Sequence, residues 1–116
     1  MKKVQGNKFY VDQEQAWEDL GEGISRKIMG YDNAVMAVKM RYEENSMAIP
    51  HLHKHSQISH VSAGKFEVTI GEEVKTLSAG DSFYVPSNML HAVVCIEQGE
   101  LIDTFSPYRA EFLAEQ

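Results

Sequence analysis

The sequence predicts an all-β protein, a sandwich or barrel of short antiparallel strands. Turn residues recur at short intervals from residue 20 to residue 88, and short runs rich in valine, isoleucine, phenylalanine, tyrosine and methionine lie between them. Many short strands with closely spaced turns are typical of sandwiches and barrels. With 116 residues, of which 43% are hydrophobic and 24% charged, the chain has ordinary globular composition and can form one core. We therefore expect residues 1–116 to form a single domain.

Each expected strand rests on a run in which apolar residues alternate with polar ones or cluster between turns. In residues 36–42 the apolar side chains fall on one face, and in residues 65–70 they alternate with charged and polar side chains. A period of two indicates a strand with one buried face. Residues 13–21 fit a short helix or an edge strand, and we expect a strand. Further strands are expected over 82–86, 91–97 and 101–105, followed by a short C-terminal helix over 108–115.

Charge and hydrophobicity exclude several classes of partner. The net charge is −6 and the basic residues are scattered, so we expect no nucleic-acid partner and no anionic membrane surface. No apolar run reaches the length of a membrane span, and no secretory signal follows the first two lysines. A cytoplasmic location is therefore expected. The single cysteine, Cys95, lies in an apolar run and is expected to be buried and unreactive.

The N-terminal segment leads to an expectation about assembly, because it carries Phe9, Tyr10 and Trp17. Large aromatic residues in this segment, together with sheet edges that need covering, favour the association of two copies of the chain. We therefore expect a homodimer.

Four of the five histidines lie between His51 and His60, and the fifth is His91. Side chains two residues apart in a strand point the same way, so His51 and His53 can reach one point, and Gln57 shares their parity. A fourth ligand has to come from another strand, and His91 is the candidate. Three imidazoles and an amide oxygen suit a borderline divalent ion and leave coordination positions open. An exposed polar loop without a metal is the alternative.

The spacing of these residues resembles the two motifs of the cupin family. The first, G-x5-H-x-H-x3,4-E-x6-G, is matched in the histidine cluster, with Gln57 in place of the acidic residue and Asn45 in place of the opening glycine. The second, G-x5-P-x-G-x2-H-x3-N, is matched around His91, with Asn88 and Cys95 in place of its second glycine and its asparagine. The resemblance implies a single-domain cupin, a double-stranded β-helix or jelly-roll barrel, with a metal held inside by His51, His53, Gln57 and His91.

Gln57 changes the charge of the expected site. Three histidines and a glutamate offset one positive charge of a divalent ion, whereas three histidines and a glutamine offset none. The ion then attracts anions more strongly, and a substrate carboxylate is the natural one. The absence of a carboxylate ligand also favours redox-neutral chemistry. We expect one divalent transition metal ion, which can be zinc, nickel, manganese, iron or cobalt, because the ligands alone do not choose among these metals.

The last expected strand places Asp103 on the same face as Leu101 and Phe105. If this face lines the barrel, Asp103 is a buried carboxylate, which is unfavourable unless it has a role or a partner. Arg109 follows the turn at Pro107 and can reach the barrel mouth, where it would bind a carboxylate bidentately. An Asp103–Arg109 ion pair that fastens the C-terminal helix to the barrel is the alternative.

A closer resemblance covers nearly the whole chain after the first dozen residues. The segments HxHxHxQIS, SAGDSFYVP and DTFSPxRxxFL, together with residues 17–32 and 35–40, are similar to the KdgF family, the pectin-degradation proteins among the cupins. This resemblance implies an isomerase-type, redox-neutral enzyme that converts 4,5-unsaturated uronate monosaccharides, released from pectin or alginate, into linear keto forms. The substrate would be a small anionic sugar. By position, the implied active-site residues are Asp103, Phe105 and Arg109.

In such a reaction Asp103 would act as general base and then as acid, Arg109 would orient the substrate carboxylate, and Phe105 would pack on the sugar. Two other functions stay open: a metal-dependent dioxygenase, since the same ligands bind iron, and a non-catalytic module that binds a sugar or a metal. His55 shares the parity of the ligands and is expected beside the metal or as a substitute ligand. His60 points the other way and is expected to be a surface or packing histidine.

Overall fold

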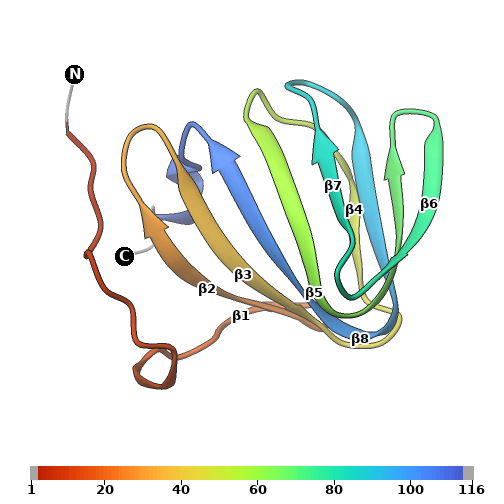
Figure 1. Cartoon of the computed structure of the whole chain (residues 1–116), viewed down its shortest axis with the longest axis horizontal. Coiled ribbons are helices and arrows are strands. Elements are labelled where there is room, and N and C mark those ends of the chain that lie inside the picture. The colour runs from red at the N-terminus through yellow and green to blue at the C-terminus, as the bar shows by residue number, and fades with distance from the viewer. Residues whose placement is uncertain (1–2, 114–116) are drawn as a thin grey trace.

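The computed structural model describes residues 3–113, and these form a curled antiparallel β-structure with almost no helix (Figure 1). Its strands are β1 (Glu18–Gly21), β2 (Ile24–Tyr31), β3 (Met36–Tyr42), β4 (Met47–His51), β5 (Ser56–Ile70), β6 (Glu73–Ser78), β7 (Ser82–Val85) and β8 (His91–Ser106). Two 3-10 turns, η1 (Asp12–Glu14) and η2 (Ala110–Phe112), precede and follow the strands. The predicted all-β fold class is confirmed.

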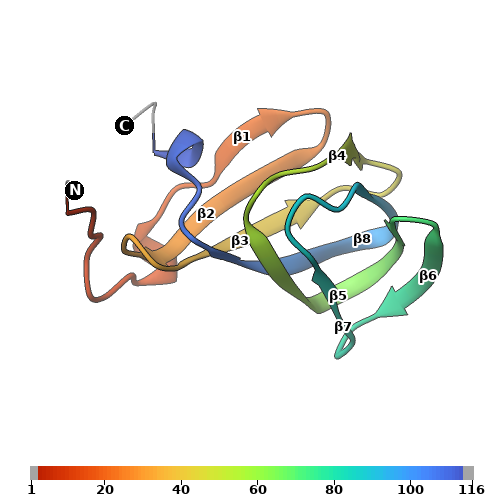
Figure 2. The same cartoon turned by 90° about the horizontal axis from the view of Figure 1, so that it is seen from above.

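Two long strands, β5 and β8, run through the molecule and pair with each other along most of their length. The first half of β5 also pairs with β7, and its second half pairs with β6. β8 begins beside β4 and ends beside β3, which continues through β2 to β1. The shared strands thus hold together two layers that face each other across the interior, as in a jelly roll (Figure 1 and Figure 2).

Both long strands bend sharply where Gly64 and Gly99 face each other, and the register between the strands shifts at this point. Gly64 has φ +83°, and a Cβ on it would lie 2.5 Å from the carbonyl oxygen of Gln98. A Cβ on Gly99 would collide with the carbonyl oxygen of Ala63. Only glycine fits such a close approach of two backbones. The bend gives each long strand a U shape and returns both of its ends to the same end of the barrel (Figure 1).

The core between the layers is formed by alternate residues of the strands. β3 buries the face that the sequence predicts, and β8 buries every second residue on either side of its bend. Tyr42 and Phe66 meet edge to face, with ring centroids 5.3 Å apart. Cys95 is buried, as expected. The buried apolar residues are Met36, Val38, Met40, Tyr42, Val61, Phe66, Val68, Phe83, Val85, Val93, Cys95, Leu101 and Phe105.

The C-terminal segment is not the α-helix expected over 108–115. It holds only the 3-10 turn η2, and residues 114–116 lie outside the described part of the chain. Arg109 before the turn is extended, with φ −90° and ψ 97°, and supplies no side-chain cap. The segment nevertheless lies against the barrel, beside β1 and β2 (Figure 2).

The N-terminal segment contains both structures that residues 13–21 allow. The turn η1 ends at Glu14, and the expected edge strand follows as β1. Lys27 of β2 fixes η1, because its Nζ donates to the carbonyl oxygen of Asp12 at 3.0 Å and to its carboxylate at 3.2 Å. Among residues 3–113, no helix is long and apolar enough to cross a membrane.

Candidate metal centre

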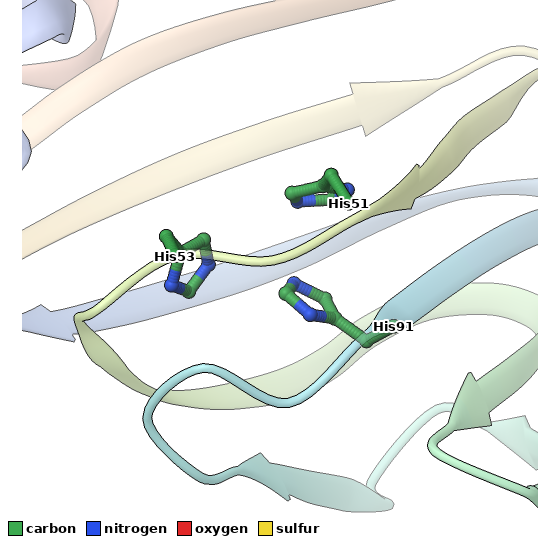
Figure 3. A group of neighbouring side chains, drawn as sticks. All are labelled: His51, His53 and His91. Atoms are coloured by element: carbon green, nitrogen blue, oxygen red, sulfur yellow. The ribbon is translucent and has the colours of Figure 1, made fainter.

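Three histidine side chains from separate elements converge at the barrel mouth (Figure 3). His51 ends β4, His53 lies in the loop before β5, and His91 begins β8. His51 and His91 are cross-strand partners, and their ring centroids are 4.2 Å apart. The centroids of His53 and His91 are 4.9 Å apart, and one nitrogen of each of the three rings lies within 4.8 Å of the others. The structure thus brings together the three histidines that the sequence analysis singled out.

The main chain aims all three rings. In each ring, Nδ1 makes a hydrogen bond to a carbonyl oxygen two residues away in the chain. A carbonyl only accepts, so Nδ1 carries the proton and donates it, and Nε2 keeps a free lone pair. This arrangement fixes the tautomer that a metal-binding histidine needs. The three bonds are His51 to Ile49 at 2.8 Å, His53 to His55 at 3.0 Å and His91 to Met89 at 2.9 Å.

The positions of the unprotonated Nε2 atoms suit a bound cation. Nε2 of His53 lies 3.0 Å from Oε1 of Gln57, although both atoms are acceptors in this tautomer. Nε2 of His91 is buried and has no hydrogen-bond partner among the described residues. Buried polar atoms are rarely left unpaired. A divalent ion between these donors would satisfy both groups, and imidazole nitrogens with an amide oxygen are a donor set that such ions accept. The residues present therefore fit a metal.

Burial keeps two of the rings neutral. Burial, together with smaller contributions from the neighbouring histidines and Arg109, lowers the pKa of His91 to about 4, against the opposing effect of the hydrogen bond to Met89. Burial also lowers the pKa of His53. At neutral pH both rings are uncharged, which is the form that binds a metal.

A buried hydrogen-bond chain leads from Gln57 to Asp103. The amide Nε2 of Gln57 donates to Oγ of Ser59 at 2.9 Å, and the hydroxyl of Ser59 donates to Oδ1 of Asp103 at 2.6 Å. Asp103 is only 6% exposed. Burial raises its pKa to about 6, opposed by the hydrogen bond from Ser59 and by the charge of Arg109. A carboxyl group with this pKa can both accept and donate a proton near neutral pH.

A cavity with a volume of about 160 Å³ contacts two of the three histidines, His51 and His91, together with Gln57 and Asp103. It is mostly apolar apart from a few convergent polar groups, as ligand sites usually are. All the residues proposed from the sequence except His53 lie in its lining, and they are joined there by two that the sequence analysis did not identify as site residues, Arg26 and Phe112. Its polar and aromatic lining includes Arg26, His51, Gln57, His91, Asp103, Phe105, Arg109 and Phe112.

Arg109 lies over the mouth rather than in an ion pair with Asp103. Its Nη2 is 2.9 Å from the carboxylate of Glu111, an ion pair on its own segment. Its guanidinium also stacks on two rings, 5.0 Å from the centroid of Phe105 and 4.6 Å from that of Phe112. These contacts hold the cationic head at the cavity, where it faces the site.

Arg26 stacks on the ring of Phe112 as well. Its guanidinium carbon is 4.1 Å from the centroid of Phe112, and Glu18 holds it through two hydrogen bonds of 3.0 and 3.2 Å. Phe112 therefore contacts two guanidinium groups. Arg26, Phe112 and Ser59 lie in segments that resemble the KdgF family, but the sequence assigned no role to them. The roles of Arg26 and Phe112 depend on a contact between β2 and the C-terminal segment, and the parity that Ser59 shares with Gln57 was a further signal that could have identified it.

The two remaining histidines lie in different surroundings. His55 is buried outside the cluster, and its Nε2 donates to the carbonyl oxygen of Tyr108 at 3.0 Å. It therefore ties the histidine loop to the C-terminal segment. His60 is exposed on β5.

Comparison with known proteins gives consistent matches. Residues 38–105 match the family model described as "Cupin domain". The pectin degradation protein KdgF of Dickeya dadantii (strain 3937) is 44% identical over 108 residues, which are 91% of this chain and 98% of that protein. Among solved structures, an RmlC-like cupin from Shewanella frigidimarina NCIMB 400 matches with a TM-score of 0.92 and 40% identity, over 94% of this chain and 98% of that one. KdgF from Halomonas sp. matches with a TM-score of 0.88 and 36% identity. The match covers 92% of this chain and 99% of that chain.

Proposed function

This chain belongs to the cupin family, in the branch that contains KdgF, and from this premise we propose that it is a metal-dependent enzyme of pectin breakdown. The finer proposal is that it opens the ring of 4,5-unsaturated uronate monosaccharides and yields their linear keto forms. In this proposal residues 1–116 form one catalytic domain. A relative named for pectin degradation and the three converging histidines support this assignment.

The proposed metal ligands are Nε2 of His51, His53 and His91 together with Oε1 of Gln57. A bound divalent ion would supply electrostatic stabilisation of negative charge on a substrate oxygen. None of the four ligands is charged, so the site favours an anionic substrate such as a uronate.

Asp103 carries the proton transfers in this proposal. In a 4,5-unsaturated uronate the ring oxygen is bonded to an enol-ether carbon, and carbon 1 is a hemiacetal. The carboxylate of Asp103 removes the proton of the anomeric hydroxyl, the bond between carbon 1 and the ring oxygen breaks, and carbon 1 becomes an aldehyde. The enolate that leaves then takes a proton at carbon 4 from the protonated Asp103, which gives the ketone. Atoms and electrons balance without an oxidant.

Arg109 and Phe105 position the sugar in this proposal. The guanidinium of Arg109 lines the cavity, and the N–H donors that Glu111 leaves free would bind the substrate carboxylate. Phe105 is 3% exposed and lies edge to face with His53, with centroids 5.8 Å apart, so it forms an apolar wall next to the proposed ligands. Such a wall packs on the sugar ring and excludes water.

One observation carries the proposal: a buried carboxylate with a raised pKa, the amide of Gln57 and two of the three clustered imidazoles line the same cavity. The test follows the conjugated enol-acid absorbance of unsaturated galacturonate. Metal-loaded protein should remove this absorbance faster than the spontaneous rate, and Asp103→Asn, which keeps an oxygen to accept from Ser59, should lose the acceleration while it binds metal normally. A background rate with the unmodified, metal-loaded protein contradicts the proposal. Turnover that requires oxygen would assign the dioxygenase alternative instead.

A further inference from the structure

Ser59 lies at the centre of the only route by which the described hydrogen bonds connect a proposed metal ligand to the proposed base. It is wholly buried on β5, directly opposite Asp103 of β8 in the strand register. Its Oγ is 2.9 Å from Nε2 of Gln57 and 2.6 Å from Oδ1 of Asp103. All three side chains are buried, so water does not compete for these bonds.

The chemistry of the three groups fixes the direction of this chain. A serine hydroxyl has one hydrogen to donate, and an ionised carboxylate only accepts. Ser59 therefore gives its hydrogen to Asp103, and its oxygen is left to accept from residue 57. Only the amide nitrogen of Gln57 can donate to it, so the amide oxygen must face the other way, towards Nε2 of His53 at 3.0 Å.

This direction explains why residue 57 is a glutamine. A carboxylate at position 57 has no hydrogen to donate, so the hydroxyl of Ser59 would stand between two acceptors and satisfy only one. Two carboxylates would also share one buried chain, which raises the free energy of the charged form of each. A glutamine in place of the usual acidic residue is thus the partner that the Ser59–Asp103 pair requires.

We propose that Ser59 is a positioning residue that turns the amide oxygen of Gln57 towards the histidine cluster and holds the carboxylate of Asp103 in place. The inference rests on the proposed function for the roles of Gln57 and Asp103. It adds that the hydroxyl acts through Gln57 on metal affinity and through Asp103 on turnover.

The first experiment measures zinc affinity and needs no substrate. The dissociation constant for Zn²⁺ is determined by competition with a chromophoric chelator for four proteins: the unmodified chain, Ser59→Ala, Gln57→Ala and the double variant. Ser59→Ala should raise the dissociation constant by about 10–100-fold, the usual effect of losing an outer partner of a ligand. In the Gln57→Ala background the same change should alter it by less than about twofold, because residues that act through one another are not additive. An equal effect of Ser59→Ala in both backgrounds would overturn the proposal.

A matched control lies on the same strand. The hydroxyl of the exposed Ser62 donates to the carboxylate of Glu100, which is half-buried, at 2.7 Å. Ser62→Ala removes a hydroxyl from β5 in the same way and should leave the zinc affinity unchanged. A loss of affinity in this control as large as in Ser59→Ala would show that general damage to β5 is responsible, and the proposal would fail.

A second pair of variants covers the case in which Ser59→Ala does not fold. Threonine and valine have nearly the same shape and differ by the hydroxyl, so Ser59→Thr and Ser59→Val place the same volume in the core. Ser59→Thr should bind zinc much more tightly than Ser59→Val. Equal affinities in the two variants would overturn the role of the hydroxyl.

The kinetic readout separates this inference from the proposed function. With saturating zinc, Ser59→Ala should lower kcat by about tenfold or more and change KM little, because Arg109 and the cavity wall are untouched. A rise in KM with kcat unchanged contradicts a role through Asp103. If no protein turns over the uronate, the proposed function fails, whereas the zinc measurements still decide the role of Ser59.

Discussion

Asp103 is a buried carboxylate, and burial changes its pKa. Its pKa in the folded protein is about 6, whereas an unfolded chain has a value near the ordinary 3.8. The folded state therefore holds the proton more tightly than the unfolded state between about pH 4 and pH 6. Above pH 6, ionised Asp103 lowers the free energy of unfolding by the full amount that this pKa difference allows. The loss becomes smaller as the pH falls and disappears below about pH 4.

The prediction at this scale concerns the stability of the metal-free protein. Asp103→Asn should raise the free energy of unfolding at pH 7.5 by about 1–3 kcal/mol, because roughly two pKa units of unfavourable ionisation are removed. The gain should vanish near pH 4. Urea unfolding in chelator at several pH values measures it, and Glu67→Gln, at an exposed position of β5, is the control. An Asp103→Asn protein that is less stable at pH 7.5 contradicts the raised pKa.

Single-residue spacing was enough to anticipate where the histidines meet. The spacing of His51 and His53, and a turn before His91, predicted three imidazoles at one end of a barrel, and the structure has them there. The strand that the parity argument assumed ends at His51, however, and His53 lies in the following loop. The roles of these residues as ligands stay predictions. The sequence did not reveal Ser59 or Arg26, because a buried serine and an arginine on a strand have meaning only through their partners on other strands.

At the scale of elements, alternation predicted the strands that bury apolar side chains on one face, such as β3 and β5. It was silent on β2, whose buried residues include Arg26 and Lys27 rather than apolar ones. Those cations are buried because Glu18 and Asp12 accept their hydrogen bonds, and Phe112 and Trp17 pack against them. Alternation of apolar residues does not detect such a strand, because the side chains that allow these cations to be buried lie outside β2. The predicted C-terminal helix was wrong, because local propensity suggested a helix whereas Arg109 is extended in the structure.

The bend of the long strands gives an element-scale prediction. Gly64→Ala should destabilise the protein by about 3 kcal/mol or more, because a Cβ at φ +83° would also lie against the backbone of Gln98 and Gly99. Gly80→Ala is the matched control: Gly80 also has a positive φ, +99°, but nothing lies within 4 Å of its Cβ. It should lose only about 1 kcal/mol. Denaturant unfolding compares the two, and equal losses would show that the close approach at the bend is tolerated.

The C-terminal segment gives a second prediction. Phe112→Leu keeps an apolar side chain but removes the ring that both Arg26 and Arg109 contact. Cation–π contacts contribute about 0.5–2 kcal/mol each, so Arg109 should be less well held and KM for the uronate should rise by several-fold to about 20-fold. Phe112→Tyr, which keeps the ring, should stay near the unmodified value. A KM unchanged in Phe112→Leu would show that this ring does not orient Arg109.

For the whole molecule, metal binding should appear as stability. A ligand that binds only the folded state stabilises it, by about 2.7 kcal/mol at a free concentration 100 times its dissociation constant. Zinc should therefore raise the melting temperature of the protein, and chelator should reverse the change. His91→Ala should abolish the zinc-dependent shift, whereas His60→Ala, which removes an exposed histidine, should keep it. A full shift in His91→Ala would exclude His91 as a ligand.

The architecture as a whole was predictable because a jelly roll follows from many short alternating strands together with two spaced motifs, and the matches to solved cupins agree with it. The sequence did not predict that two long strands would belong to both layers, because this depends on pairing between residues that are distant in sequence. The expected homodimer remains a prediction, which light scattering of the purified protein would check.

The U-shaped course of β8 sets a strict limit on how this sequence can change. From His91 to Asp103 a straight strand would span ~40 Å, yet both residues line one cavity and both belong to the same alternating set. Inserting or deleting one residue between them would exchange inside for outside along the rest of the strand. Substitutions on the outer face of this stretch are therefore free to accumulate in related genes, whereas changes in its length should be almost absent.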